Sequence, residues 1–206
     1  VFVLSNAFSE VVLISGSIIM GLPLALLPAQ ILWVNLIVDG LPSVALAFEK
    51  GENVMVRKPE KKENIFTGNT KKLIAIFAIV TDLALFALFY YALQATNNID
   101  YARTMAFVGL GLTSLFYVFS IKFLYLPVWR INPFSNSALN MGVLIGMGLY
   151  IISIYSEFFR NILGTVALGV NDWYILTALG LFNIAVIELG KFIFLNKNKI
   201  EKSLRS

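Results

Sequence analysis

The 206-residue sequence contains no cysteine and no histidine. A chain without cysteine forms no disulfide and no thiolate metal site. A chain without histidine offers no imidazole ligand and no His-based acid–base catalysis, so soft-metal transport is disfavoured. Charged residues are also scarce, at 14% of the chain, compared with roughly a quarter in an ordinary soluble domain. Because hydrophobic residues make up 58%, the composition indicates an integral membrane protein.

Long apolar runs predict an all-α, polytopic membrane helix bundle with about six transmembrane helices, since a span needs about 20 apolar residues. No alternation typical of strands competes with this prediction. The predicted spans are residues 1–21, 29–48, 71–93, 101–123, 138–155 and 172–195. We treat 1–206 as a single transmembrane domain with a polar loop over 49–70 and a basic tail over 196–206. The apolar start at Val1, without a methionine or a signal-peptide pattern, is typical of a cut inside a helix.

Lysine and arginine are distributed unevenly between the two predicted sides of the membrane. Only Arg103 and Arg160 fall on one side. The other side carries the remaining basic residues, which are Lys50, Arg57, Lys58, Lys61, Lys62, Lys71, Lys72, Lys122, Arg130, Lys191, Lys197, Lys199, Lys202 and Arg205. Cytoplasmic loops are enriched in these residues. The basic loops and the C-terminus are therefore predicted to be cytoplasmic, in the cell membrane if the protein is bacterial.

The stretch over residues 30–49, QILWVNLIVDGLPSVALAFE, which contains nearly all of the second span, carries Asn35 and Asp39 in its middle. An ionised carboxylate in hydrocarbon is costly without a partner, so an intramembrane acid is a functional-site hypothesis. Pro42 has no N–H and its ring crowds the preceding turn, which predicts a helix broken at Asp39-Gly40-Leu41-Pro42. Carbonyl groups freed at membrane depth persist only where they face protein or line a polar cavity. Together with carboxylate and amide oxygens, they suit a hard cation.

LPAQILWVNLIVDGLP, preceded by SNAFSEVV, closely resembles the fifth and sixth transmembrane helices of calcium-type (type II) P-type cation-transporting ATPases. The resemblance continues in Met55, Pro59, ARTMAF at 102–107, NPFSN at 132–136 and an acid–lysine pair in the last helix. It covers essentially all of the chain, as the fifth to tenth helices of that family. The phosphorylated aspartate, the ATP-binding and actuator domains and the first four helices lie upstream in the family. This sequence has no DKTGT-like or P-loop motif.

The resemblance implies that Asn35 and Asp39 are cation ligands and that Glu10 is the carboxylate that the fifth helix directs at the same site. Asn35 and Asp39 are four residues apart and share a helix face. The oxygen-only ligand set and the family favour Ca²⁺ as the transported cation, while manganese, magnesium and sodium remain open. ATP and Mg²⁺ would act only through the missing domains, so we expect no catalytic residue in this chain and no ATPase activity from it alone.

Three positions depart from the two-ion calcium pumps of the family. Ala7 replaces Asn, Val38 replaces Thr, and Ser114 stands where the eighth helix offers Glu or Gln. The departures predict one cation per cycle, with Glu10 either completing that site or carrying counter-transported protons. Without the cation, two neighbouring carboxylates in a low dielectric repel each other, which favours proton uptake.

Other interpretations of the same residues remain. Asn35 and Asp39 could form a structural polar kink, and Glu10 an interhelical hydrogen bond. Asp82, without a basic residue at helical spacing, fits a structural role better than transport, and Glu188 has the spacing of an ion pair with Lys191. The GxxxG of Gly142 and Gly146 permits close helix approach.

Two other functions also remain for the whole chain. A secondary transporter would need an inverted repeat, and no second broken segment with a central acid is present. A non-transporting scaffold or regulatory fragment is the other alternative. The expected partners are the missing N-terminal helices and cytoplasmic domains of the same pump and the lipid bilayer, with no nucleic acid.

Overall fold

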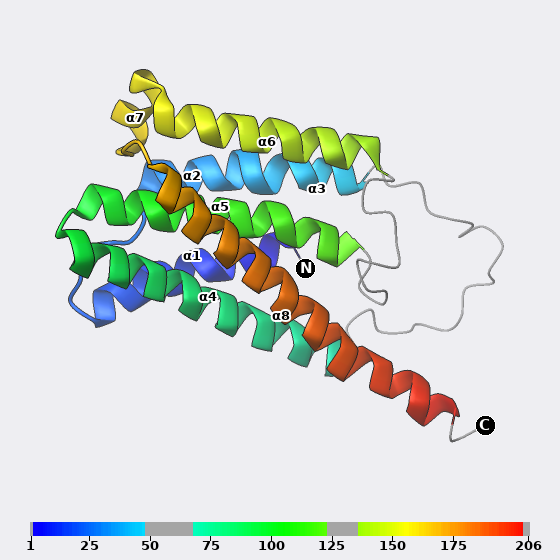
Figure 1. The fold of residues 1–206 in the computed structure, drawn as a ribbon. Helices are drawn as coiled ribbons and strands as arrows, with labels where there is room; N and C mark the ends of the chain where they lie inside the picture. The colour runs from blue at the N-terminus through cyan, green and yellow to red at the C-terminus, as the bar shows by residue number, and fades with distance from the viewer. Residues whose placement is uncertain (1, 48–67, 123–135, 204–206) are drawn as a thin grey trace.

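The computed structural model describes residues 2–47, 68–122 and 136–203. In these ranges the chain is helical and contains no strand, which confirms the predicted helical bundle (Figure 1). The elements are α1 (Phe2–Ile19), α2 (Pro28–Trp33), η1 (Val34–Asp39), α3 (Gly40–Ala47), α4 (Gly68–Thr96), α5 (Ile99–Lys122), α6 (Ser137–Tyr155), α7 (Glu157–Leu163) and α8 (Val170–Ser203). Helices are expected here because lipid offers no water to backbone N–H and C=O groups.

Four helices contain segments that are long and apolar enough to cross a membrane. These segments are 78–96 in α4, 99–120 in α5, 137–155 in α6 and 170–192 in α8. The apolar part described for α1, residues 7–19, is shorter. The elements α2, η1 and α3 follow one another without a gap. Their 6, 6 and 8 residues together provide the roughly 20 residues that a crossing needs.

Several helices extend beyond the apolar runs that predicted them. Helix α4 begins at Gly68, inside the predicted loop 49–70, and α8 continues to Ser203, through most of the predicted tail. The short helix α7 forms in a stretch where no helix was predicted. Hydropathy marks where apolar sequence ends, whereas polar residues with good helix propensity can continue the helix past that point. Met55 and Pro59 lie outside the described residues.

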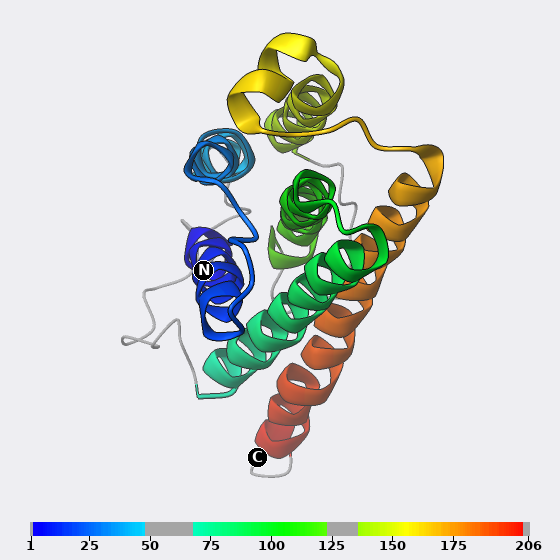
Figure 2. The same ribbon diagram turned by 90° about the vertical axis from the view of Figure 1, so that its left-hand side faces the viewer.

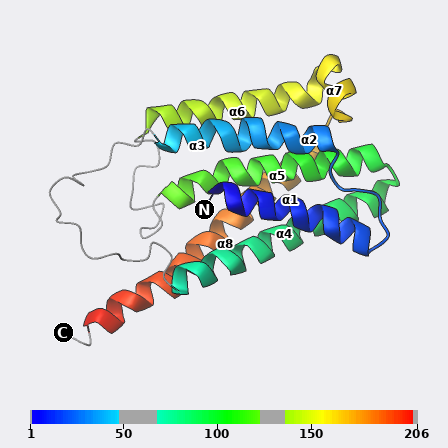
Figure 3. The same ribbon diagram turned by 180° about the vertical axis from the view of Figure 1, so that it is seen from behind.

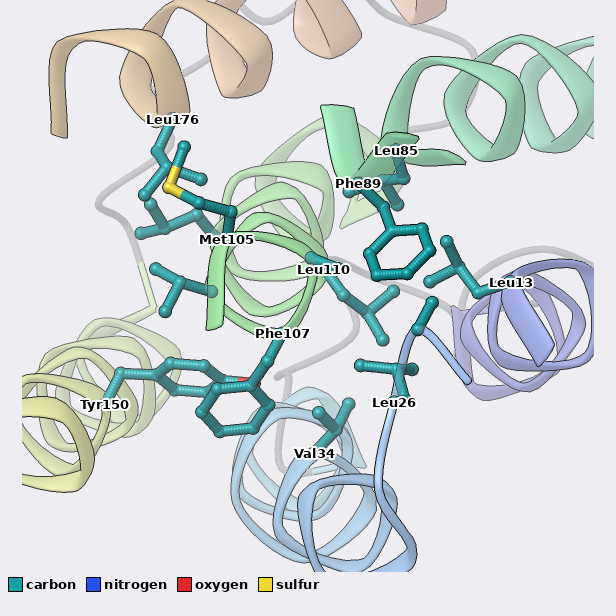
Figure 4. Close-up of a cluster of buried hydrophobic side chains, with 14 of the residues drawn as sticks. Leu13, Leu26, Val34, Leu85, Phe89, Met105, Phe107, Leu110, Tyr150 and Leu176 are labelled. Atoms are coloured by element: carbon teal, nitrogen blue, oxygen red, sulfur yellow. The ribbon is translucent and has the colours of Figure 1, made fainter. Parts of the chain in front are cut away.

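Helix α5 is the centre of the bundle. Its apolar segment is 83% buried, while those of α4, α6 and α8 are 33–39% buried. Viewed along the bundle, α5 is surrounded by the other helices (Figure 2). Side chains from these helices and from the turn before α2 converge on it, including Leu13, Leu26, Phe89, Tyr150 and Leu176 (Figure 4). Helix α5 is therefore buried in protein, whereas much of α4, α6 and α8 is free to face lipid.

Two small residues let neighbouring helices approach α5 and its partners closely. A Cβ on Gly111 would lie 2.2 Å from the ring of Tyr150, which stacks on Phe107 with ring centroids 4.8 Å apart. A Cβ on Gly180 of α8 would lie 2.4 Å from the ring of Phe116. These glycines create the space into which the aromatic rings fit, a recurrent use of small residues in membrane helix packing.

The connections that the structure describes lie at one end of the bundle, where α7 is found (Figure 1). There the buried Gln30 accepts a hydrogen bond from the Leu27 N–H at 3.0 Å and donates one to the Leu163 carbonyl at 3.0 Å. Arg103 donates to the Leu24 carbonyl at 2.9 Å. These bonds tie the turn before α2 to α5 and α7. They therefore fix where the composite helix α2–η1–α3 enters the bundle.

Candidate cation site

The composite helix contains one full segment of π-helix, η1, just before Gly40. The Gly40 N–H donates to the carbonyl of Asn35, five residues earlier, whereas an α-helix would use the residue four earlier. The predicted irregularity is thus present, but it occupies residues 34–39, and the helix continues through Pro42 to Ala47. The physical reason is local. The Pro42 ring crowds the carbonyl of Val38 and cannot donate to it, so the preceding turn widens. Such π segments occur frequently at functional sites.

Helix α6 packs directly against the backbone of this irregular segment. A Cβ on Gly142 would lie 3.4 Å from the Leu41 carbonyl oxygen, and one on Gly146 would lie 3.9 Å from the Ile37 carbonyl oxygen. The GxxxG pattern identified in the sequence thus lets α6 approach η1 and α3. Asn136, at the start of α6, donates to the Ala45 carbonyl at 3.4 Å. Protein therefore covers one side of the widened turn, as freed carbonyls at membrane depth require.

Glu10 and Asn35 meet between α1 and η1, two elements that contact each other. Figure 3 shows α1 and the α2–α3 helix from the side of the bundle on which both lie. The Asn35 Nδ2 is 3.2 Å from Glu10 Oε1 and 3.3 Å from Oε2, and it also donates to the Ile31 carbonyl at 3.0 Å. Glu10 is buried, with 7% of its surface exposed. The side chain of Asp39, the third predicted ligand, lies outside the described side chains. Its backbone ends η1, four residues after Asn35.

The amide orientation determines what this pair can bind. With Nδ2 facing Glu10, the two side chains satisfy each other, and the Asn35 oxygen is not used by the pair. A hard cation is bound through oxygen atoms only. Cation binding would therefore require Glu10 to release the Asn35 amide nitrogen and Asn35 to rotate so that Oδ1 faces the cation. No group of three or more His, Cys, Asp or Glu capable of holding a metal occurs among the described residues. A cation site here therefore depends on amide and backbone oxygens as well as carboxylates.

One side of the Glu10–Asn35 pair is uncovered by the described part of the chain. Asn35 is exposed, and apolar side chains within three residues of Glu10 or Asn35 in the sequence are exposed too. They are Phe8 (49%), Val11 (60%), Leu32 (69%) and Leu36 (64%). A polar amide exposed among apolar residues at membrane depth lacks a suitable environment in lipid.

The structure places the three positions that depart from the two-ion pumps on three different elements. Val38 is fully buried, in the main apolar cluster around α5. Ser114 is 2% exposed on α5, and Ala7 is partly buried on α1.

Three other acidic or basic residues singled out in the sequence do not take part in the Glu10–Asn35 contact. Glu188 and Lys191 form the predicted ion pair, with Lys191 Nζ 2.8 Å from Glu188 Oε1 and both side chains about 5–6% exposed. Asp82 is buried on α4. The sequence analysis overlooked Asn183 of α8, which lies 3.2 Å from Thr81 Oγ1 and is 1% exposed. The feature that could have identified Asn183 in the sequence is its position as a polar residue in the middle of the last predicted span.

Comparison with known proteins identifies the family. A family profile described as "Cation transporting ATPase, C-terminus" matches residues 23–193. This chain belongs to that family. The matched range includes the widened helix with Asn35 and Asp39 but begins after α1. The family profile therefore does not cover α1, which contains Glu10. The similarity of α1 to this family comes from the individual relatives described next.

Several calcium-transporting ATPases align with nearly the whole chain. The "Calcium-transporting ATPase" of Bacillus subtilis (strain 168) is 35% identical over 178 residues, or 84% of this chain. "Calcium-transporting ATPase 1" of Bacillus cereus is 31% identical over 92% of it. The human "Calcium-transporting ATPase type 2C member 1" is 28% identical over all of it. The aligned parts are 20%, 23% and 22% of these relatives. The chain therefore spans about a fifth of the length of the relatives it matches and corresponds to their C-terminal membrane region.

Proposed function

We propose that this chain is the cation-translocating membrane part of an ATP-driven calcium pump, with Glu10, Asn35 and Asp39 as ligands of the transported cation. The observation that carries the proposal is the Glu10–Asn35 contact, because it brings two predicted ligands from different helices together beside a π segment. The same contact is also an interhelical hydrogen bond, the structural alternative named for Glu10, and the Asp39→Asn test below distinguishes the two.

Ligand counting supports a single cation. Ca²⁺ takes about six to eight oxygens. Glu10 offers two carboxylate oxygens, Asn35 one amide oxygen and Asp39 up to two more. The Val38 carbonyl, which has no N–H to accept from at Pro42, adds a backbone oxygen. Because Val38 is buried in apolar surroundings and cannot donate an oxygen from its side chain, a second neighbouring site lacks ligands.

The uncovered side of the pair supports the proposed partners. The exposed apolar residues around Asn35 form a surface onto which further helices of the same pump would pack and complete the coordination. The remaining exposed apolar surface of α4, α6 and α8 fits the lipid bilayer. ATP and Mg²⁺ would act in cytoplasmic domains beyond this chain, so ATPase activity is expected from the whole pump and not from these residues alone. The basic end of the bundle and the C-terminus would face the cytoplasm.

The test is cation-dependent ATP hydrolysis by the full-length pump with Asp39→Asn. We expect loss of Ca²⁺ activation over the range that saturates the wild type, since a charged ligand is replaced by a neutral one. Asp100→Asn is the matched control, because Asp100 lies in the first turn of α5 with a side chain 57% exposed. Normal Ca²⁺ activation in Asp39→Asn would favour a structural kink, and transport without ATP would favour a secondary transporter.

A further inference from the structure

Asp82 has no charged partner among the described side chains. It lies in the middle of α4, with 1% of its surface exposed. Neither of its carboxylate oxygens has a hydrogen bond of acceptable geometry with the rest of the described chain. The side chain of Ser9, on α1, faces it. An acid this deeply buried is expensive to keep ionised, and proteins normally supply a partner or neutralise it.

Few charged groups are available on the helices packed against α4, which are α1, α5 and α8. The described charged side chains on these helices are Glu10, Asp100, Arg103, Asp172, Glu188 and Lys191, and the tyrosines are Tyr101, Tyr117 and Tyr174. Only Arg103 and Lys191 are basic. The acids among them could only disfavour a negative charge on Asp82.

Both basic residues are engaged elsewhere. Lys191 is paired with the buried Glu188. The contact between Thr81 and Asn183 fixes the level of α8 that lies beside Asp82. Lys191 is eight residues further along α8, or about 12 Å at the helical rise.

Arg103 lies toward the other end of the bundle. It binds the Leu24 carbonyl and lies 3.6 Å from Asp100. Gly109 packs against Leu85, and Arg103 is six residues further from that level, or about 9 Å. No described cation is therefore placed to neutralise Asp82.

We propose that Asp82 is a proton-binding site of the membrane domain, in which the carboxyl is held as the neutral acid against Ser9. A protonated carboxyl has one O–H donor. The Ser9 hydroxyl, which would donate to an ionised Asp82, would accept this hydrogen from the neutral acid. The step is proton transfer alone: the carboxylate gains H⁺ from the aqueous side and later returns it, with no other bond made or broken.

The placement of Ser9 connects this site to the cation site. Ser9 and Glu10 are consecutive on α1, so one side chain faces α4 while the next contacts Asn35 on η1. A shift of α1 as Glu10 exchanges the Asn35 amide for a cation moves Ser9 relative to Asp82. The inference that Asp82 releases its proton when the cation binds rests on the proposed function. That Asp82 is protonated in the cation-free state does not.

The first test is infrared difference spectroscopy of the full-length pump, between Ca²⁺-bound and Ca²⁺-free states. The wild type is expected to show a carboxylic-acid C=O band that Asp82→Asn lacks and Asp100→Asn keeps. Ser9→Ala should move this band without removing it, which keeps the test usable if Asp82→Asn does not fold. A wild-type difference spectrum that Asp82→Asn and Ser9→Ala leave unchanged overturns the release of the proton on cation binding. A Ca²⁺-free absolute spectrum in which Asp82→Asn removes no carboxylic-acid band overturns the proposal itself.

The second test measures protons counter-transported per cation in sealed vesicles, with a pH dye trapped inside. Asp82→Asn, which mimics the neutral acid, should lose one proton per cycle relative to Asp100→Asn. An unchanged ratio means that Asp82 does not exchange its proton during transport and overturns that part of the proposal. If Asp39→Asn also keeps normal Ca²⁺ activation, the proposed cation site itself fails. The Asp82 band in the Ca²⁺-free absolute spectrum still reports whether Asp82 is protonated, so the two failures are distinguishable.

Discussion

The replacement Asn35→Asp is the most direct perturbation of the candidate site. In the structure, the Asn35 amide nitrogen lies 3.2 and 3.3 Å from the two Glu10 oxygens. The variant places a second carboxylate where a hydrogen-bond donor now lies. Two unit charges about 4 Å apart repel by about 4 kcal/mol at an effective dielectric constant of 20. The empty site is therefore destabilised by about that amount unless a proton or a cation binds.

Cation binding and proton binding should consequently compete more strongly in this variant. At high pH the cation relieves the repulsion, so we expect an affinity for Ca²⁺ at least equal to that of the wild type. At low pH one carboxylate holds a proton that the cation must displace, so affinity falls more steeply as the pH decreases. If about half of the 4 kcal/mol is realised, the calcium affinity of the variant changes by about 30-fold across the pH range, since 1.4 kcal/mol is a factor of 10.

The assay is equilibrium binding of radioactive calcium to the full-length pump at a series of pH values. Asn98→Asp is the matched control, because Asn98 is exposed in the α4–α5 turn. Its side chain accepts hydrogen bonds from the Asp100 and Tyr101 N–H groups, a role that aspartate also fills. The reasoning is refuted if Asn35→Asp binds calcium with the affinity and pH dependence of the wild type, because Glu10 and Asn35 would then lie outside the cation site.

Three further predictions follow from the packing. Gly142→Val, whose branches would press on the Leu41 carbonyl, should lower stability by about 1–3 kcal/mol in thermal unfolding of the detergent-solubilised pump. Gly148→Val, with open space around it, is the control, and equal effects would contradict close packing of α6 on α3. Glu188→Gln leaves Lys191 buried without its anionic partner and should cost about 3–5 kcal/mol, and adding Lys191→Met should recover most of it. If the double variant is no more stable than Glu188→Gln alone, the broken Glu188–Lys191 pair is not the cause of the stability loss. Ser114→Ala should leave calcium affinity nearly unchanged in the same binding assay, and a large loss would place α5 in the cation site.

The residues that depart from two-ion pumps fit the packing of the bundle. Val38 contributes to the apolar cluster that surrounds α5, so its side chain helps hold the composite helix against the centre. A threonine there would add a hydroxyl that needs a partner. Val38 therefore supports the composite helix through apolar packing and offers no side-chain oxygen, which fits the single cation proposed beside η1.

Composition and hydropathy were sufficient to predict a helical membrane bundle and most of its helices, because about 20 consecutive apolar residues have few other stable arrangements. The residues 30–42, with a central amide, an acid and a proline, were sufficient to locate an irregular turn and to suggest its family. The steric effect of proline acts within one helix, so it can be inferred locally. The sequence could not place the widened turn at 34–39, because that position depends on how the whole composite helix relieves the clash.

Tertiary structure alone decided which helices meet and which faces are buried. Lipid and protein interior are both apolar, so an apolar side chain gives no indication of which one it faces. For this reason α5 could not be recognised as the central helix, and the isolation of Asp82 from every described cation could not be foreseen. The contact between Glu10 and Asn35, which are 25 residues apart in the chain, exists because the turn after α1 brings α2 and η1 back alongside it.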